Sequence, residues 1–358
     1  MLIFLTALIA MISKAPELRA QDSRRAFPVS ISAYIEAYYA YDFDRPEQVR
    51  QDFLFNHNRH QSAQINLAYI SAEVEQPLYR AKVSLQTGTY AMDNYAGEPV
   101  ELRPILEAYA GLKLSQKRNF WLDVGVFESH IGFEYVESMK NPTLSRSLVA
   151  EHSPYFLAGG RMVYQPNEKL ELLTVIANGW QRIQPLTGNS LPSFGTGIYY
   201  QAGPRLALSW NTLAGTDDPD DIRRWRYYNN FYAEWQAGEK GLLIAGFDIG
   251  IQQAARGSSS YERWYVPTLI YRQVLDEKWS TSLRMEYFHD ARSVLIQTAY
   301  ADGFRTAGYS LNVDYRPAPN VALRVEGRIF EGEDPYFREG RSRQNATLLA
   351  SLAIALGR

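Results

Sequence analysis

The sequence predicts an all-β protein: a transmembrane antiparallel β-barrel of about sixteen strands, with short periplasmic turns and long extracellular loops. Three observations predict this fold. Apolar and polar residues alternate with a period of two along most of the chain. The connections between these alternating runs are short and long in turn. Tyrosine and tryptophan residues gather near the short connections.

Composition and the first residues set limits on class and location. The 358 residues include no Cys and carry a formal net charge of -2, which excludes disulfides and thiolate metal sites and gives no reason to expect nucleic acid as a partner. The apolar run from Leu2 to Ile12, followed by Leu18-Arg19-Ala20, predicts a signal peptide over residues 1–20. Residues 21–358 would then form a single barrel domain. A buried core helix is the other interpretation of the apolar run.

The alternation begins after about Phe27. Apolar side chains occupy every second position from Val29 to Phe43 and in Leu106–Leu114, and most of the alternate positions in Tyr79–Gly88 and Val321–Ile329. About sixteen such runs begin near residues 28, 61, 78, 104, 119, 154, 168, 194, 204, 222, 241, 261, 277, 303, 319 and 342. An even number in this range is typical of bacterial outer-membrane barrels. The register is least clear near 194 and 261, where the second run contains Pro267, a residue that interior strand positions tolerate badly.

The connections between the runs alternate in length. The short ones are Gln76-Pro77, Ser115–Asn119, Gln165–Lys169, Ala202–Arg205, Gly238–Gly241, Leu275–Lys278 and Pro317–Asn320. The long ones are Asp44–His60, Tyr90–Arg103, Ile131–Pro154, Gln181–Ser193, Gly215–Asp221, Gln253–Ser260, Asp290–Asp302 and Gly332–Arg341. Tight turns at one end and longer loops at the other are expected of a membrane barrel, whereas a soluble sandwich has no reason to keep this order.

Aromatic residues near the short connections support the same fold. They are Tyr79, Phe120, Trp121, Tyr164, Trp235, Trp279 and Tyr315. An aromatic ring with a polar tip suits the boundary between membrane and water, although strands are rich in aromatic residues in any case.

The polar faces of the runs carry charges that a dry core would exclude, because each uncompensated buried charge costs several kcal/mol. A barrel of roughly sixteen strands leaves an aqueous channel, whereas about eight strands leave a filled interior. We therefore predict that nine charged residues line a channel: Arg80, Lys82, Glu107, Lys113, Arg284, Glu286, Arg324, Glu326 and Arg328. Cations outnumber anions among these nine by six to three, so we expect a mild anion preference at most.

The longest connection, Ile131–Pro154, contains charges of both signs and turn-forming residues. A loop of this length inside a compact domain is usually functional. One interpretation is a solvent-exposed outer loop. We favour a constriction loop, in which Arg146, Glu151 and His152 turn into the lumen and narrow it, because charges at constrictions set pore selectivity.

Motifs for catalysis are scarce, and we expect neither an enzyme nor a cofactor. The sequence contains no Gly-x-Ser-x-Gly elbow and no Walker-type loop. Ser129-His130 beside Glu128 raises the alternative of an outer-membrane hydrolase, but sequence adjacency supplies neither an orienting group nor an oxyanion site. Asn56–His60 and Asp217–Asp221 could bind a metal ion, but the first matches no known ligand spacing and the second is followed by neutralising arginines. We predict polar loops at both places.

Five segments resemble a known family. They are SAYIEAYYAYDF at 32–43, FNHNRH at 55–60, WLDVGVFESHIG at 121–132, NPTLSRSLVAEHSPYFLAGG at 141–160 and WNTLAGTDDPDD at 210–221. They are similar to segments of the OmpL-like β-barrel porins of Bacteroidota, and the resemblance covers most of the chain after the signal peptide. It implies a barrel in the outer membrane of a Gram-negative bacterium, and it adds little about the substrate.

The function that we expect is passive diffusion of small hydrophilic solutes through a water-filled barrel. The expected partners are outer-membrane lipid, lipopolysaccharide and these solutes. The sequence also allows a homo-oligomer. One alternative is a non-conducting barrel, plugged by its own loop, that acts as an interaction or scaffold subunit of an outer-membrane assembly. Another is a soluble all-β binding protein. The apolar outward faces argue against it, because together they would form one connected apolar surface exposed to water.

Overall fold

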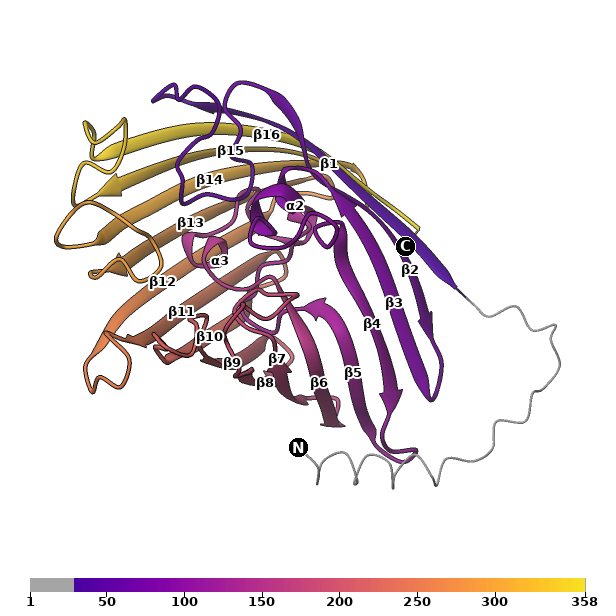
Figure 1. Cartoon of the computed structure of the whole chain (residues 1–358). Coiled ribbons are helices and arrows are strands. Elements are labelled where there is room, and N and C mark those ends of the chain that lie inside the picture. Colours follow the sequence, from indigo (N-terminus) through magenta and orange to yellow (C-terminus); the bar gives the residue numbers. More distant parts are fainter. Residues whose placement is uncertain (1–28, 358) are drawn as a thin grey trace.

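The computed structural model describes residues 29–357, and these form a closed barrel in which every strand is antiparallel to its neighbours and β1 pairs with β16 (Figure 1). The strands are β1 (Ser30–Asp42), β2 (Ala63–Glu75), β3 (Tyr79–Thr87), β4 (Ile105–Lys113), β5 (Asn119–Glu128), β6 (Phe156–Asn167), β7 (Leu170–Ala177), β8 (Ser193–Gly203), β9 (Leu206–Gly215), β10 (Arg226–Ala237), β11 (Gly241–Gln253), β12 (Tyr261–Val274), β13 (Trp279–Asp290), β14 (Phe304–Ala318), β15 (Val321–Gly332) and β16 (Gln344–Leu356). The signal peptide predicted at residues 1–20 lies outside the described residues.

The predicted fold class is confirmed. Sixteen strands are present in residues 29–357, and each begins close to its predicted start; the largest difference is at β10, which begins at Arg226 rather than near residue 222. Pro267 lies within β12, with its ring on the exposed outer face. The ladder between β12 and β13 passes from Tyr265–His289 to Thr268–Glu286 and so skips Pro267, because proline has no N–H to donate.

The connections alternate in length as predicted. Residues 168–169, 204–205 and 319–320 are short turns, whereas the other end carries long loops. Three short helices lie in these loops: α2 (Thr89–Asn94), the 3-10 helix η1 (Ser138–Lys140) and α3 (Leu148–Glu151). None of the helices in residues 29–357 is long and apolar enough to span a membrane.

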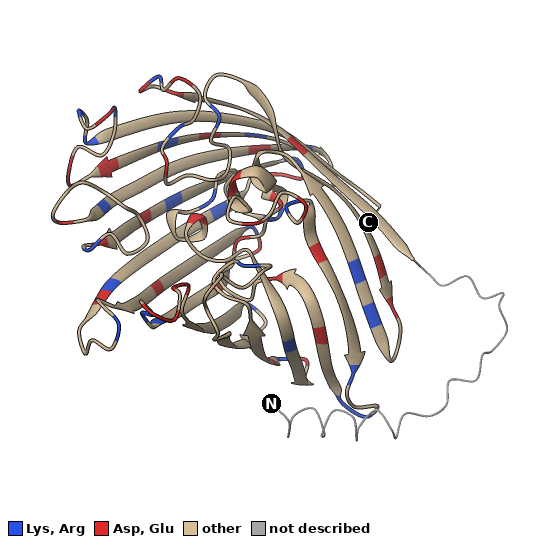
Figure 2. Ribbon diagram, viewed as in Figure 1, with Lys and Arg blue, Asp and Glu red and all other residues tan. Residues whose placement is uncertain are grey.

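The two faces of the barrel wall differ in polarity. In β15 the side chains of Leu323, Val325 and Ile329 are exposed on the outside, while the alternate positions are buried on the inside. Consecutive side chains of a strand point to opposite faces of the sheet. Alternating apolar and charged residues therefore give the barrel an apolar outer face and a charged inner face. Figure 2 shows charged residues along the strands as well as in the loops.

Two residues depart from the predicted alternation. Leu106 is buried rather than outward, because a bulge between Ser84 and Leu85 shifts the register of β3 with β4 at this point. Trp121 is also buried inside, whereas we predicted it at the membrane interface. It follows Phe120 directly, and two adjacent strand residues cannot both face the lipid.

The buried apolar residues lie inside the barrel, where the loops pack against the wall. One cluster joins Phe53 and Leu54 of the first long loop to Leu148 and Val149 of α3 and to aromatic residues of β13–β15. A second joins tyrosines around α2 to β1, β2 and the start of β6. The long loops therefore fold into the barrel and share a core with its inner wall.

Candidate functional site

The loop between β5 and β6, residues 129–155 and here named L3, is the longest connection among the described residues. Its first limb lies against the wall of β8–β12. The His130 ring fits beside Gly195, whose hypothetical Cβ would lie 2.8 Å from His130 Cε1. His130 Nε2 donates a hydrogen bond to the carbonyl of Thr212 at 2.9 Å, and Gly132 N donates to Asn230 Oδ1 at 3.1 Å. Phe133 packs against β10, β11 and β12.

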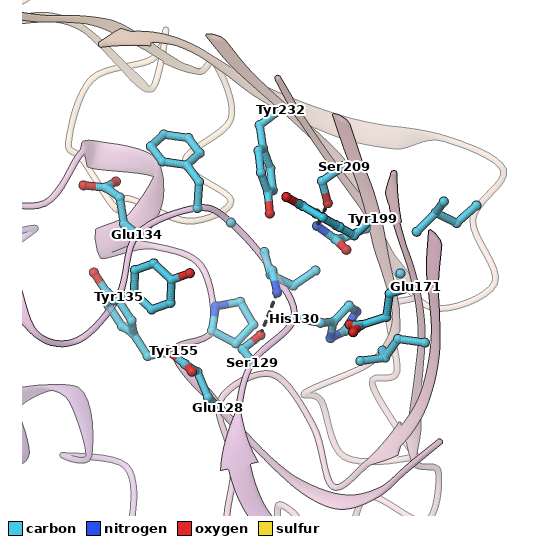
Figure 3. A pocket seen from close by; sticks show the side chains of 18 of the residues that line it. Glu128, Ser129, His130, Glu134, Tyr135, Tyr155, Glu171, Tyr199, Ser209 and Tyr232 are labelled. Atoms are coloured by element: carbon cyan, nitrogen blue, oxygen red, sulfur yellow. Dashed lines mark hydrogen bonds between the residues drawn. The ribbon is translucent and has the colours of Figure 1, made fainter. Parts of the chain in front are cut away.

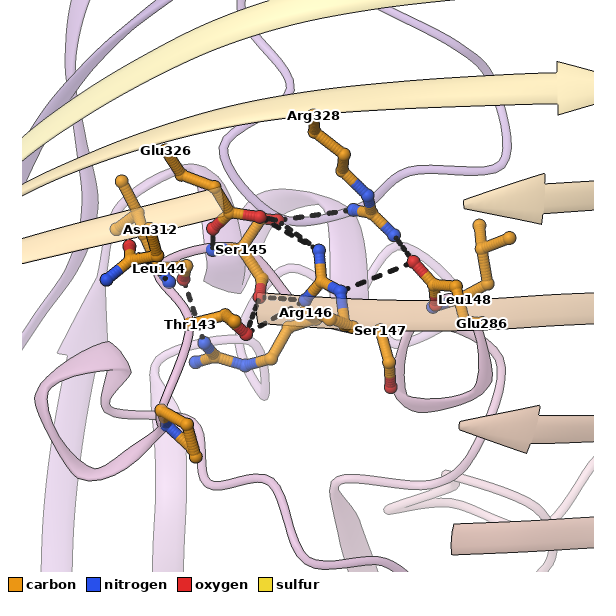
Figure 4. A network of polar contacts seen from close by, with 12 residues as sticks. Thr143, Leu144, Ser145, Arg146, Ser147, Leu148, Glu286, Asn312, Glu326 and Arg328 are labelled. Atoms are coloured by element: carbon orange, nitrogen blue, oxygen red, sulfur yellow. Dashed lines mark hydrogen bonds and ion pairs between the residues drawn. The ribbon is translucent and has the colours of Figure 1, made fainter. Parts of the chain in front are cut away.

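The next part of L3 reaches a different wall, formed by β13, β14 and β15 (Figure 4). Ser145 donates two hydrogen bonds to the carboxylate of Glu326, from its backbone N at 2.6 Å and from its hydroxyl at 2.7 Å. Leu148 N donates to Glu286 Oε2, and Leu144 N donates to Asn312 Oδ1 at 3.1 Å. Backbone N–H groups of L3 are thus satisfied by inward side chains of the strands.

The same wall carries a connected set of ion pairs. Arg284 lies between two carboxylates, with 3.3 Å to Glu286 and 2.9 Å to Glu326. Arg328 pairs with Glu286 at 2.6 Å. All four side chains are at most 1 % exposed. A buried pair needs further hydrogen bonds to offset its loss of hydration, and Arg284 finds them on Ser145, whose hydroxyl and carbonyl oxygens accept at 2.9 and 2.7 Å.

Arg324 holds the preceding part of L3. It pairs with Asp314 of β14 at 2.7 Å and donates hydrogen bonds to the carbonyls of Asn141 and Pro142 at 3.1 and 3.2 Å. It also contacts the carbonyl of Ser138 at the 3-10 turn. One guanidinium therefore satisfies several carbonyl groups of a non-helical segment, which water would otherwise have to solvate.

A second group of inward charges lies on β3–β6. Lys82 and Glu107 form an ion pair, and Asp123 accepts from two arginines, Arg80 at 2.7 Å and Arg161 at 2.9 Å. Lys113 lies beside the Trp121 ring, 5.8 Å from its centroid. Their basic side chains and Glu107 are partly exposed, unlike the Arg284 network, whereas Asp123 is buried beneath its two arginines.

All three residues predicted to narrow the lumen belong to L3, but their side chains contact other parts of the loops. Arg146 is fully buried and donates to the carbonyl of Val136. Glu151 accepts from Phe55 N at 2.8 Å and from Asn56 N at 3.2 Å. His152 Nε2 donates to Phe53 O at 3.0 Å. Burial raises the pKa of Glu151 to about 7 and lowers the pKa of His152 to about 4. A narrowing role for these side chains stays a prediction.

A cavity of about 370 Å³ remains between L3 and the wall of β6–β10 (Figure 3). L3 contributes Ser129, His130, Glu134 and Tyr135 to its lining. The strands contribute Glu128, Arg161, Glu171, Leu173, Gly197, Tyr199, Ser209, Asn211, Tyr232 and Glu234, among others. Burial lowers the pKa of His130 to about 4, so this imidazole is uncharged at neutral pH.

The nine predicted lining residues thus fall into two groups, one on β3 and β4 and one on β13 and β15, separated in the ring by β16, β1 and β2. Their role as channel lining stays a prediction. Sequence reasoning missed two acidic partners, Asp123 and Asp314. Each stands at an inward position between apolar residues, so the same alternation would have found them. It could not have identified Ser145 or Asn312, because nothing in their local sequence indicates a long-range contact.

The alternative sites of the sequence analysis have other contacts. The ring of His57 lies 3.3 Å from Glu36, and His60 Nδ1 accepts a hydrogen bond from Asp42 N. The acidic loop pairs with arginines, as in Asp218 with Arg224 at 2.8 Å. Ser129 Oγ accepts from Ile131 N at 3.1 Å. These side chains stabilise loop conformations.

Solved structures with a similar fold include outer-membrane channels and porins. The chain is similar to the outer-membrane channel DcaP of Acinetobacter baumannii, with 12% identity and a TM-score of 0.61 over 95% of this chain and 100% of that chain. It is also similar to an anion-selective porin from Comamonas acidovorans, with 8% identity and a TM-score of 0.61 over 92% of this chain and 99% of that chain. A third similar structure is OmpF of Salmonella typhi in complex with daunomycin, with 11% identity and a TM-score of 0.61 over 92% of this chain and 97% of that chain. At these identities the likeness concerns the fold.

No curated protein matches the chain. A family model does, over residues 28–356, and its description is "Putative beta-barrel porin-2, OmpL-like". This match includes all sixteen strands and L3. The chain therefore belongs to the OmpL-like family of β-barrel porins.

Proposed function

We propose that the protein is a porin, through which small hydrophilic solutes diffuse passively across the outer membrane of a Gram-negative bacterium. The family and the sixteen-strand barrel support this location and function. A barrel of this size is wide enough for water, and its inner face is charged. The host that we infer from the sequence resemblance is a member of the Bacteroidota.

The observation that carries the proposal is the position of L3. The loop folds into the barrel, crosses from the β8–β12 wall to the β13–β15 wall, and leaves a cavity of about 370 Å³ beside it. An inward loop that reduces the cross-section without filling it restricts passage by size. We therefore infer that L3 is the constriction.

Planar-bilayer recording of the refolded, detergent-purified barrel tests this function. We expect steady ohmic steps in single-channel current. Deleting Asn141–Ala150 should raise the step size, because this segment contains the groups that hold L3 on the β13–β15 wall. An unchanged step size after the deletion would exclude L3 as the constriction, and a folded, inserted barrel that never conducts would exclude the porin.

One observation favours a second candidate, a barrel closed by its own loops that serves as a subunit of an outer-membrane assembly. The middle of L3 is deeply buried, and Leu144, Arg146 and Leu148 are not exposed at all. The loop thus occupies much of the lumen. The conductance experiment separates this scaffold from the porin, since only the porin carries current.

Further properties belong to the same proposal. We expect transport without catalysis or cofactor, because diffusion down a gradient requires neither. We also expect the outer loops to contact lipopolysaccharide. An OmpT protein of Vibrio cholerae with a similar fold (TM-score 0.61, 10% identity) has a trimer form. We propose that this chain also assembles into a homo-oligomer, which cross-linking in membranes would reveal.

A further inference from the structure

We infer that the open passage beside L3 favours small cations over anions, and that Glu128, Glu171 and Glu234 are the residues that determine this preference. The inference rests on the proposed porin function and adds the class of solute. It depends on which charges face the open cavity and which are covered by L3.

The arginines of β13 and β15 are not available to a passing anion. Arg284, Arg324 and Arg328 are at most 2 % exposed and pair with three carboxylates, those of Glu286, Asp314 and Glu326. L3 covers this wall, and its carbonyl and hydroxyl oxygens accept further hydrogen bonds from Arg284 and Arg324. The charges of these three arginines and three carboxylates therefore balance, so this set adds no net positive charge beside the cavity.

The lining of the cavity has the opposite character. Glu128 is exposed, and Glu171 and Glu234 are partly exposed. Glu134 of L3 also lines the cavity, but its carboxylate accepts from Ser147 N at 3.1 Å within the loop. Arg161 is the one Arg or Lys among the described residues that line the cavity, and it pairs with Asp123 at 2.9 Å. The hydrogen bond to Glu171 comes from the neutral amide of Gln165, at 2.6 Å, so it leaves the charge of the carboxylate in place.

The neutral groups of the lining also suit a cation. Tyr135, Tyr199 and Tyr232 line the cavity from different sides (Figure 3). The face of a tyrosine ring attracts a cation electrostatically, and its hydroxyl oxygen can accept from an ammonium group. Carboxylates in a narrow space with low-dielectric walls raise the local concentration of cations and lower that of anions.

This inference replaces the mild anion preference that we expected from the sequence. That expectation counted the arginines of β13 and β15 as if they faced water. It also omitted Asp123, Asp314 and three carboxylates that line the cavity, those of Glu128, Glu171 and Glu234.

The test compares reversal potentials in a KCl gradient for the full barrel in planar bilayers. The variant is E128Q/E171Q/E234Q, which keeps side-chain size and removes three charges. The matched control, E168Q/E239Q/E277Q, removes three charges from exposed residues of the short turns, outside the cavity. The single variant E128Q is a second probe, because Glu128 is the most exposed of these three carboxylates.

We expect the wild type and the control to pass K⁺ in preference to Cl⁻, and the triple variant to lose about threefold or more of this ratio at low salt. E128Q should lose part of it. A conducting wild type with a ratio at or below one, or a triple variant with the ratio of the control, would overturn the inference and leave the porin intact. A silent wild type would overturn both.

Discussion

Glu286 of β13 lies 2.6 Å from Arg328 of β15 through one carboxylate oxygen, while its other oxygen accepts the backbone N–H of Leu148 in L3. One buried carboxylate thus joins the barrel wall to the loop that enters it. The neighbouring Glu326 does the same with Arg284 and Ser145. The stability of the wall and the position of L3 are therefore coupled through two side chains.

Replacing Glu326 by Gln should release L3 from the wall. The change leaves Arg284 with less compensation in a dry site, and breaking a buried pair typically costs about 3–5 kcal/mol. We expect a lower free energy of unfolding and larger, noisier current steps. Denaturant titration in detergent and bilayer recording measure the two effects. E331Q, an exposed position on the outer side of the same strand, is the control. Equal behaviour of the two variants would contradict the coupling.

The contact between L3 and the first long loop should depend on pH. Burial raises the pKa of Glu151 from 4.5 to about 7. At pH values between 4.5 and 7, Glu151 is therefore protonated when the two loops pack together and ionised when they separate. Packing should thus strengthen as the pH falls from about 8 towards 5, by up to about 3 kcal/mol. The positive charges of Arg146 and Arg328 lower the pKa of Glu151 and so reduce this pH dependence.

Amide hydrogen exchange of Phe55 and Asn56, corrected for the intrinsic rate, measures this packing, because both N–H groups donate to Glu151. We expect greater protection at pH 5 than at pH 8. E151Q should remove the pH dependence, whereas D52N, an exposed change in the same loop, should keep it. Protection that rises with pH in the wild type would show that the sign is wrong.

The space beside Gly195 should be needed for L3 to dock. A Cβ at this position would lie 2.7 Å from Val175 Cγ1 and 2.8 Å from both His130 Cε1 and the carbonyl oxygen of Thr212. G195A should therefore destabilise the barrel by about 1–3 kcal/mol, which is typical of overpacking. Gly203 of the same strand has open space at its Cβ position, so G203A is the control. Unfolding midpoints of the two variants would be compared, and equal midpoints would exclude a tight fit of His130.

Thiol labelling should locate the open passage. The chain contains no Cys, so an introduced residue is the sole thiol. Tyr199 lines the cavity, whereas Ser310 pairs in register with Arg284 and Arg328 under L3. A methanethiosulfonate reagent should reduce the current of Y199C within seconds and leave S310C unchanged. Rapid block of S310C would mean that solutes pass along the arginine wall.

The sequence by itself determined the barrel. A strand shows its faces through a period of two, and this pattern is local, so Val325 beside Glu326 already indicates an apolar outside and a charged inside. The number and approximate starts of the strands followed from the same period. Leu106 departed from the prediction because a bulge shifts the register of β3 with β4. Trp121 departed from it because the residue next to Phe120 in a strand must take the opposite face.

Only the tertiary structure decided where L3 lies and which charges it covers. The contact of Ser145 with Glu326 joins residues 181 positions apart, and that of Gly132 with Asn230 joins residues 98 apart. Such contacts depend on the closed shape of the wall and on the conformation of a non-repetitive segment, neither of which leaves a periodic signal. The arginines of β13 and β15 were visible in the sequence, but their pairing and burial were properties of the assembled barrel.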